Sequence, residues 1–352
     1  MTAASPPRAS VIIVTRRGRG HLEGCLRAVF GQRLPGGFEV VLVDNGSEDG
    51  SVDRALLDHP SLRVVRAGRN LGFAGGNNLG LRESAGEFPV LLNDDTRVRS
   101  GWLAALVEAA EAEPRAGAVG SLVVFQKPAG TIDSAGLDLL DDGAVVGRGT
   151  LEPAPGQPGR REEVFAACGN GMLLRRAALE RVGCFDEAFF AYFEDADLCW
   201  RMRLAGWTCW LEPAAVVDHL HAATAGVWSD FYHFQVRRNR LLVVVKNAPP
   251  DLVWKSLSDL GGLLARSLAR AAVRRVAPDR ASPDWPTRTG TRTQFQVIGS
   301  LLRHLPGALR QRRAIRGQKR VSDREIRAWM RPAAAVYARP HRIGDGSVAG
   351  LG

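Results

Sequence analysis

Four short apolar segments alternate with helical segments in the first hundred residues, and this order constrains the fold more than any other feature. The apolar segments are SVIIVT (residues 10–15), EVVLVD (39–44), LRVV (62–65) and FPVLLN (88–93). A helix is predicted to open at Ser51, a residue type that caps helix N-termini, just before VDRALL. Continuous apolar strands between helices are typical of a parallel sheet covered on both faces. The sequence therefore predicts an α/β fold whose ligands bind beyond the carboxyl ends of the strands.

Acidic residues follow two of these segments, at the edge of the sheet where ligands are expected. Asp44 ends the second segment, and Asp94 and Asp95 follow the fourth. Two adjacent carboxylates repel each other and are costly to bury. Asn and Asp residues commonly start solvated turns, whereas a divalent cation would turn the repulsion into attraction. These few residues leave both interpretations open.

Charge is unevenly distributed along the chain. From Lys246 onward there are 21 Lys and Arg residues against 7 Asp and Glu, a net charge of +14. The preceding residues carry 26 against 30, a net charge of −4. A basic C-terminal part suggests an anionic partner, either a membrane surface or a nucleic acid.

The pattern becomes helical after about residue 245. Its apolar residues share one face and its arginines the other, which fits a helix packed on its own domain as well as a membrane-surface helix. The apolar face comprises Val253, Leu257, Leu260, Leu264, Leu268 and Ala271, and the opposite face Arg266, Arg270 and Arg274.

Several protein classes are not expected. No run approaches the roughly 18 apolar residues of a membrane-spanning helix, and the N-terminal residues do not resemble a secretory signal. The five cysteines form no CxxC pair, and their odd number favours reduced thiols in a cytoplasmic protein. The glycines Gly18, Gly20 and Gly24 approximate a dinucleotide-binding pattern after the first strand, which keeps an NAD-dependent dehydrogenase as an alternative. Two arginines before the first glycine and a three-residue last interval weaken that alternative.

Further motifs occur in a fixed order: VVLVDNGSEDGS, NLGFAGGNNLGL, LLNDDT, the segment 171–207, His219 and RRNRLL. Together they resemble glycosyltransferase family 2, in its rhamnosyltransferase-like branch that builds cell-surface polysaccharides. The resemblance implies a GT-A fold at residues 10–245, with a nucleotide-binding half at about 10–125 and an acceptor half at about 126–245. A tail (1–9) precedes it, and a basic, largely helical extension (246–352) follows. It further implies sugar transfer from a nucleoside diphosphate donor with Mg²⁺ or Mn²⁺.

The resemblance also implies roles for the acidic residues. Asp44 would contact the nucleotide base, Asp94 the ribose and Asp95 the metal, because a hard cation held by oxygen ligands stabilises charge on the leaving diphosphate. The remaining implied donor contacts are Thr15, Asn70, Asn78, Arg238 and Asn239, although the last two also fit a surface charge run. Where the family usually has an aromatic residue after Thr15, this chain has arginines, so the base is left open.

The segment FFAYFEDADLCWR supplies three more carboxylates. A sugar hydroxyl is a poor nucleophile, so a base must take its proton. The family pattern places that base at Asp195, with Glu194 as its catalytic neighbour and Asp197 pointing elsewhere if a helix starts here. Acids also favour helix N-termini, but the flanking Phe and Tyr residues would desolvate a carboxylate and raise its pKa.

The resemblance implies that His219, rather than His221, faces the metal or the diphosphate. A zinc site is not expected, because no cysteines have suitable spacing. The acceptor side is predicted to include Gly169, Asn170 and Gly171.

We therefore expect an inverting, metal-dependent glycosyltransferase, peripheral at the cytoplasmic face of the membrane, that acts on a lipid-linked glycan. Inversion follows if a single base drives one in-line displacement. A processive membrane synthase is not expected, because the chain lacks spanning segments. The alternatives are the dehydrogenase and a non-catalytic binder of anionic polymers. Nucleic acid is disfavoured, because the acidic clusters would repel it and aromatic residues do not interleave with basic ones. The oligomeric state, the sugar and the acceptor are left open.

Overall fold

The computed structural model describes residues 6–220, 229–276 and 291–338, which form two compact units. The first unit comprises residues 1–138, 146–224 and 319–322, and the second comprises 139–145, 225–318 and 323–352. The helix Asp230–Asn247 belongs to the second unit, and the predicted functional boundary at residue 245 stays a prediction.

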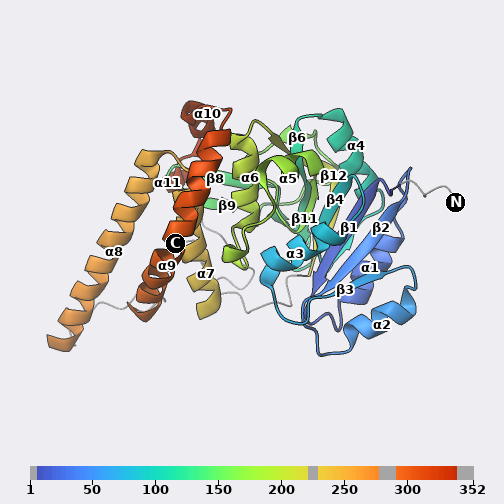
Figure 1. Ribbon diagram of the computed structural model, residues 1–352, viewed down its shortest axis with the longest axis horizontal. Helices are drawn as coiled ribbons and strands as arrows, with labels where there is room; N and C mark the ends of the chain where they lie inside the picture. Colours follow the sequence, from blue (N-terminus) through green and yellow to red (C-terminus); the bar gives the residue numbers. More distant parts are fainter. Residues whose placement is uncertain (1–5, 221–228, 277–290, 339–352) are drawn as a thin grey trace. The chain divides into compact units, whose positions relative to one another are not determined.

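A ten-stranded mixed sheet forms the centre of the first unit (Figure 1). Its order is β10-β12-β6-β11-β4-β1-β2-β3, with β5 paired to β12 and β7 paired to β6. The strands are β1 (Ala9–Thr15), β2 (Phe38–Asp44), β3 (Arg63–Arg66), β4 (Phe88–Asn93), β5 (Thr96–Val98), β6 (Ala116–Phe125), β7 (Ile132–Ser134), β10 (Glu162–Glu163), β11 (Gly171–Leu174) and β12 (Thr208–His219).

The predicted parallel strands are confirmed as β1 to β4, which pair in the order β3-β2-β1-β4. The adjoining strand β11 runs antiparallel to both β4 and β6, so the sheet is mixed beyond β4. The helices of this unit are α1 (Leu22–Phe30), α2 (Ser51–Asp58), α3 (Gly72–Glu83), α4 (Trp102–Ala112), α5 (Arg176–Val182), the 3₁₀ helix η1 (Glu187–Phe189) and α6 (Glu194–Leu204). Ser51 is the first residue of α2 and not its cap, because Gly50 occupies the cap with a φ of 74°.

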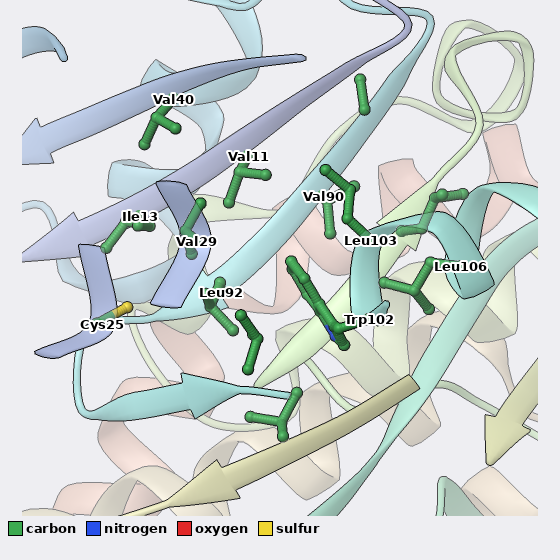
Figure 2. Close-up of a cluster of buried hydrophobic side chains, with 14 of the residues drawn as sticks. Val11, Ile13, Cys25, Val29, Val40, Val90, Leu92, Trp102, Leu103 and Leu106 are labelled. Atoms are coloured by element: carbon green, nitrogen blue, oxygen red, sulfur yellow. The ribbon is translucent and has the colours of Figure 1, made fainter. Parts of the chain in front are cut away.

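Alternate residues of β1 serve the two faces of the sheet, since successive strand side chains point in opposite directions. Val11 and Ile13 join the core that α1 and α4 cover (Figure 2). On the other face, α3 lies so close that a Cβ at Gly80 would come within 2.3 Å of Ile12 Cγ2. Helices therefore cover both faces, as the sequence predicts.

The second unit is largely helical and includes strands of a small sheet, in which Met330 lies opposite Leu139. Its three long helices α7, α8 and α9 pack against one another. The helices are α7 (Asp230–Asn247), α8 (Pro250–Val276), α9 (Thr291–Gln318), α10 (Asp323–Ala328) and α11 (Ala333–Tyr337), and β13 (Met330–Arg331), β8 (Leu137–Leu140) and β9 (Val145–Gly147) form a small sheet in the order β13-β8-β9.

Candidate active site

Polar side chains gather where β1, β2 and β4 end. The register pairs Thr15 with Asp44, so the first two strands end level with each other. After β4 the chain turns through Asp94 and Asp95 into β5. Thr15 Oγ1 donates a hydrogen bond of 2.5 Å to Asp94 Oδ2, which ties the end of β1 to this turn.

The pairing of β5 with β12 brings a distant histidine to the same turn. Thr96 lies opposite His219, the last residue of β12, and the Leu220 amide donates to the Asp95 carbonyl at 2.9 Å. His219 Nε2 consequently lies 3.3 Å from Asp95 Oδ1. The structure thus brings together the two residues that the sequence predicts as metal ligands.

A second carboxylate contacts the other side of the same ring. Asp133 Oδ2 lies 2.6 Å from His219 Nδ1. Burial lowers the pKa of His219, but the bonds to Asp133 and Asp95 outweigh it and raise that pKa to about 9. For Asp95, burial acts to raise the pKa, and the hydrogen bond and charge of His219 lower it below its usual value. His219 is therefore held between two acidic groups.

The donor atoms of this pair suit a hard divalent cation. Among the described residues, no group of three or more His, Cys, Asp or Glu side chains could hold a metal ion alone. The 3.3 Å between Asp95 Oδ1 and His219 Nε2 is close to the roughly 3 Å that separates neighbouring ligands of an octahedral ion with bonds of about 2.1 Å. Phosphate oxygens and water commonly complete such coordination. The pair therefore fits part of a Mg²⁺ or Mn²⁺ site that is completed by a diphosphate.

Asp94 has a second neighbour that the sequence did not single out. His21 Nε2 lies 3.4 Å from Asp94 Oδ2, and this contact, opposed by burial, raises the pKa of His21. The predicted ribose contact of Asp94 stays a prediction.

The carboxylate of Asp44 is engaged by its own surroundings. Its Oδ1 accepts the Ser47 amide at 2.8 Å, and its Oδ2 accepts Arg66 Nη1 at 2.9 Å. Any contact of Asp44 with a nucleotide base would therefore be shared with Arg66.

Two asparagines predicted as donor contacts bond within the protein. Asn70 Oδ1 accepts from the Gly72 amide at 2.9 Å and from Asn45 Nδ2 at 3.2 Å. Asn78 is buried on α3, where its amide group donates to and accepts from the backbone of Phe185 at 2.9 and 3.0 Å. These bonds give both residues structural roles and do not support donor contacts, which stay predictions.

The acidic segment starts a helix, as the proposed orientation of its carboxylates requires. Asp197 forms a buried ion pair of 2.8 Å with Arg201, four residues later on α6. Asp195 is half-buried, and its Oδ2 accepts the Gly169 amide at 3.0 Å. Burial raises the pKa of Asp195. Asp197 is thus structural, whereas the half-buried Asp195 with its raised pKa stays the candidate general base.

Glu194 lies in a more enclosed position than Asp195. It is 5% exposed, and among the described residues its Oε2 has no hydrogen-bond partner. Burial, together with the charge of Asp195, raises the pKa of Glu194 well above its usual value. Glu194 is therefore a buried neighbour of the candidate base.

Three residues just before α6 have positive backbone φ angles. Phe190, Tyr192 and Phe193 have φ values of 64°, 71° and 71°, a region that residues other than glycine rarely adopt. The Phe190 carbonyl accepts the Ala74 amide at 3.1 Å, so α3 holds this segment. Strain of this kind persists where surrounding structure fixes it, often at functional sites.

The predicted acceptor residues lie between the candidate base and the candidate metal ligands. The Gly169 amide donates to Asp195. Asn170 Oδ1 accepts from Asn93 Nδ2 at 2.8 Å, and Asn170 Nδ2 lies 3.5 Å from His219 Nδ1. Gly171 begins β11 beside β4. The structure therefore places residues 169–171 between the candidate base and the candidate metal ligands.

Arg238 and Asn239 belong to the second unit. Both are buried on α7, where Arg238 Nε donates to Asn239 Oδ1 at 2.8 Å. Their closure over a diphosphate stays a prediction, and the competing residue His221 lies outside the described residues.

Comparisons with known proteins identify the family and the fold of this chain. The family model described as glycosyl transferase family 2 matches residues 10–183. The chain is 33% identical over 240 residues to N-acetylglucosaminyl-diphospho-decaprenol L-rhamnosyltransferase of Mycobacterium tuberculosis, covering 61% of this chain and 77% of that protein. It is also 25% identical over 288 residues to the low-salt glycan biosynthesis hexosyltransferase Agl10 of Haloferax volcanii, covering 76% and 87%.

Among solved structures, GalNAc-T7 with UDP, GalNAc and Mn²⁺ matches with a TM-score of 0.54 at 17% identity. The match covers 68% of this chain, which spans about half (48%) of that structure. This likeness shows the GT-A fold that the sequence motifs imply. The chain belongs to glycosyltransferase family 2.

Proposed function

We propose that this glycosyltransferase is inverting and metal-dependent, and that it moves a sugar from a nucleoside diphosphate to a glycan acceptor. The main support is the contact between Asp95 and His219, which puts two ligands for a hard cation beyond the carboxyl end of β4. Residues 169–171 connect this pair to Asp195, so a base lies near the place where a diphosphate would bind.

In the proposed reaction, Asp195 takes the proton of the acceptor hydroxyl as that oxygen attacks the anomeric carbon, and the bond from this carbon to the nucleoside diphosphate breaks. The Gly169 amide donates a hydrogen bond to Asp195 Oδ2. The raised pKa of Asp195 makes its carboxylate a stronger base. Asp95 and His219 would hold the cation, which when bound offsets the charge developing on the diphosphate. Since one base drives one displacement, the configuration at the anomeric carbon inverts.

We further propose a lipid-linked acceptor, with Mycobacterium tuberculosis N-acetylglucosaminyl-diphospho-decaprenol L-rhamnosyltransferase as the supporting relative. For such an acceptor we propose cytoplasmic, peripheral binding at the inner membrane face. None of the helices in the described parts of the chain is long and apolar enough to cross a membrane. The exposed side of α9 supports the proposed surface contact.

One side of α9 exposes apolar residues spaced seven apart, here named the α9 stripe. It consists of Phe295, Leu302 and Leu309, which are 51%, 62% and 50% exposed. The helix contains six arginines and no acidic residue. Apolar side chains beside arginines suit an anionic lipid surface, since the first enter the headgroup boundary and the second pair with phosphates.

Family membership decides against the two alternatives. A dehydrogenase would need the glycines after β1 to approach a pyrophosphate, but a Cβ at Gly18 would lie 2.8 Å from Leu22 Cβ, so Gly18 packs against α1. A non-catalytic polymer binder would have no use for a half-buried base beside paired cation ligands.

Calorimetry of nucleoside diphosphate binding, with and without Mn²⁺, tests the proposal. We expect Mn²⁺ to strengthen binding to the parent chain and not to Asp95→Asn. Asp218→Asn is the matched control, because Asp218 is on β12 beside His219 but pairs with Arg99. Equal Mn²⁺-dependent affinity in Asp95→Asn and parent would refute the metal site, and retention of anomeric configuration by NMR would refute inversion.

A further inference from the structure

Asp133 lies closer to the imidazole of His219 than Asp95 does. Its Oδ2 lies 2.6 Å from Nδ1, whereas Asp95 Oδ1 lies 3.3 Å from Nε2. The Asp133 side chain is 16% exposed and that of His219 is 10% exposed, so solvent reaches this contact little. We propose that Asp133 is a positioning residue that fixes the proton of His219 at Nδ1 and turns Nε2 toward the cation site. This inference rests on the proposed metal dependence.

A metal binds only the neutral form of an imidazole, and that form carries a single proton. An ionised carboxylate only accepts hydrogen bonds, so the ring nitrogen that faces it must carry the proton. Asp133 and Asp95 compete for that proton, and the shorter contact favours Nδ1 at Asp133. Nε2 is then left with the lone pair that a metal requires. Without Asp133, Asp95 would draw the proton to Nε2 and block coordination.

The fold keeps Asp133 in this position. Ser134 lies opposite Val123 on β6, and Ser134 and Ile132 are both buried. The backbone carbonyl of Asp133 accepts Thr150 Oγ1 at 2.8 Å. Alternation along β7 therefore buries its two neighbours on one side and turns Asp133 to the other, toward His219.

Asp133→Ala and Asp133→Asn in the full chain test the inference. With nucleoside diphosphate present, we expect Asp133→Ala to lower Mn²⁺ affinity by about 10- to 100-fold, the usual effect of losing the partner of a metal-bound histidine. Asp133→Asn should recover part of this loss, because its amide oxygen can still accept the Nδ1 proton. Asp218→Asn removes the same charge one residue from His219 and should leave Mn²⁺ affinity unchanged.

The ¹⁵N shifts of the histidine ring nitrogens give a second readout, which a purely structural role would not move. In the parent chain without metal, at a pH above the His219 pKa of about 9, the neutral ring of His219 should carry its proton on Nδ1, and in Asp133→Ala on Nε2. If the parent chain and Asp133→Ala carry the same tautomer, or bind Mn²⁺ with equal affinity, this inference is wrong and the proposed metal dependence still stands. If the parent chain binds no Mn²⁺, the proposed metal dependence fails and this inference fails with it.

Discussion

Asp195 is half-buried, and backbone amides hold both of its carboxylate oxygens: the Gly169 amide donates to Oδ2 and the Ala196 amide to Oδ1. Because an amide side chain of the same shape cannot take a proton, Asp195→Asn should lower turnover by about 10²- to 10⁴-fold. Donor affinity should change little, since the lost interaction matters in the transition state. Glu194→Gln should have a smaller effect, because Glu194 is buried. Sugar transfer by both variants, with donor affinity measured alongside, checks this; an inactive Glu194→Gln beside an active Asp195→Asn would exchange their roles.

Glu194 should weaken the fold at neutral pH. Its pKa is raised by burial, so ionisation is more favourable in the unfolded chain than in the folded one. The protonated Glu194 carboxyl contributes its full stabilisation at pH values below its pKa in the unfolded chain, which is about 4.3. This stabilisation is lost as pH rises toward the pKa of Glu194 in the folded chain. Glu194→Gln should therefore be more stable than the parent, by a margin that grows from pH 5 to pH 8. Urea unfolding at both pH values measures it.

The exposed Glu180→Gln serves as the control for that series. A margin for Glu194→Gln that is constant with pH, or equal to that of Glu180→Gln, would show that ionisation of Glu194 costs the fold nothing.

Some site residues can be predicted from the sequence and others cannot. Asp94 and Asp95 follow a continuous apolar strand, which alone places them at the ligand-binding edge. The contact of Asp133 with His219 depends on β12 and β7 both pairing with β6, a relation that local pattern does not encode. Asn78 is predicted as a donor contact from motif resemblance alone. Such a resemblance does not reveal that the side-chain amide of Asn78 bonds to the backbone of Phe185.

The first four strands are predictable as elements, because each is a short apolar run that ends in polar residues. Their observed bounds differ from the predicted ones by no more than one residue. The direction of β11 is not predictable in this way, since its four apolar residues fit either orientation. Neighbouring strands β4 and β6 determine it.

The start of α3 is an element boundary that admits only glycine. Gly72 has a φ of 71°, and a Cβ there would lie 2.4 Å from the Phe190 carbonyl oxygen. Gly72→Ala should therefore cost about 1–2 kcal/mol for the left-handed backbone and more for the displaced segment. Because that segment leads into α6, turnover should fall as well. Urea unfolding and transfer assays measure the two effects.

Gly68→Ala isolates the backbone part of this effect. Gly68 has a φ of 69°, and nothing lies within 4 Å of its Cβ position. It should show the backbone cost alone and retain turnover. If Gly68→Ala and Gly72→Ala lose equal stability and equal turnover, the contact with Phe190 has no role in positioning the base.

Charge divides the whole chain into a mildly acidic body and a basic C-terminal part, with net charges of −4 and +14 on either side of Lys246. At physiological salt such fields act over about 8 Å, so they matter only for surfaces in near contact. An enzyme with this division would present its basic part to anionic lipid while its acidic clusters bind a cation.

The intact chain should therefore sediment with anionic vesicles and less with neutral ones, and added salt should weaken this binding. Replacement of the α9 stripe (Phe295, Leu302 and Leu309) by serine should release the protein from the vesicles, because the inserted apolar area is lost. Leu57→Ser is the control, since Leu57 is 79% exposed on α2, outside the basic part. The α9 stripe is excluded as the contact if the stripe variant binds the vesicles as well as the parent does. It is also excluded if Leu57→Ser releases the protein from the vesicles. Equal binding of the parent to neutral and anionic vesicles would show that the arginines do not select the surface.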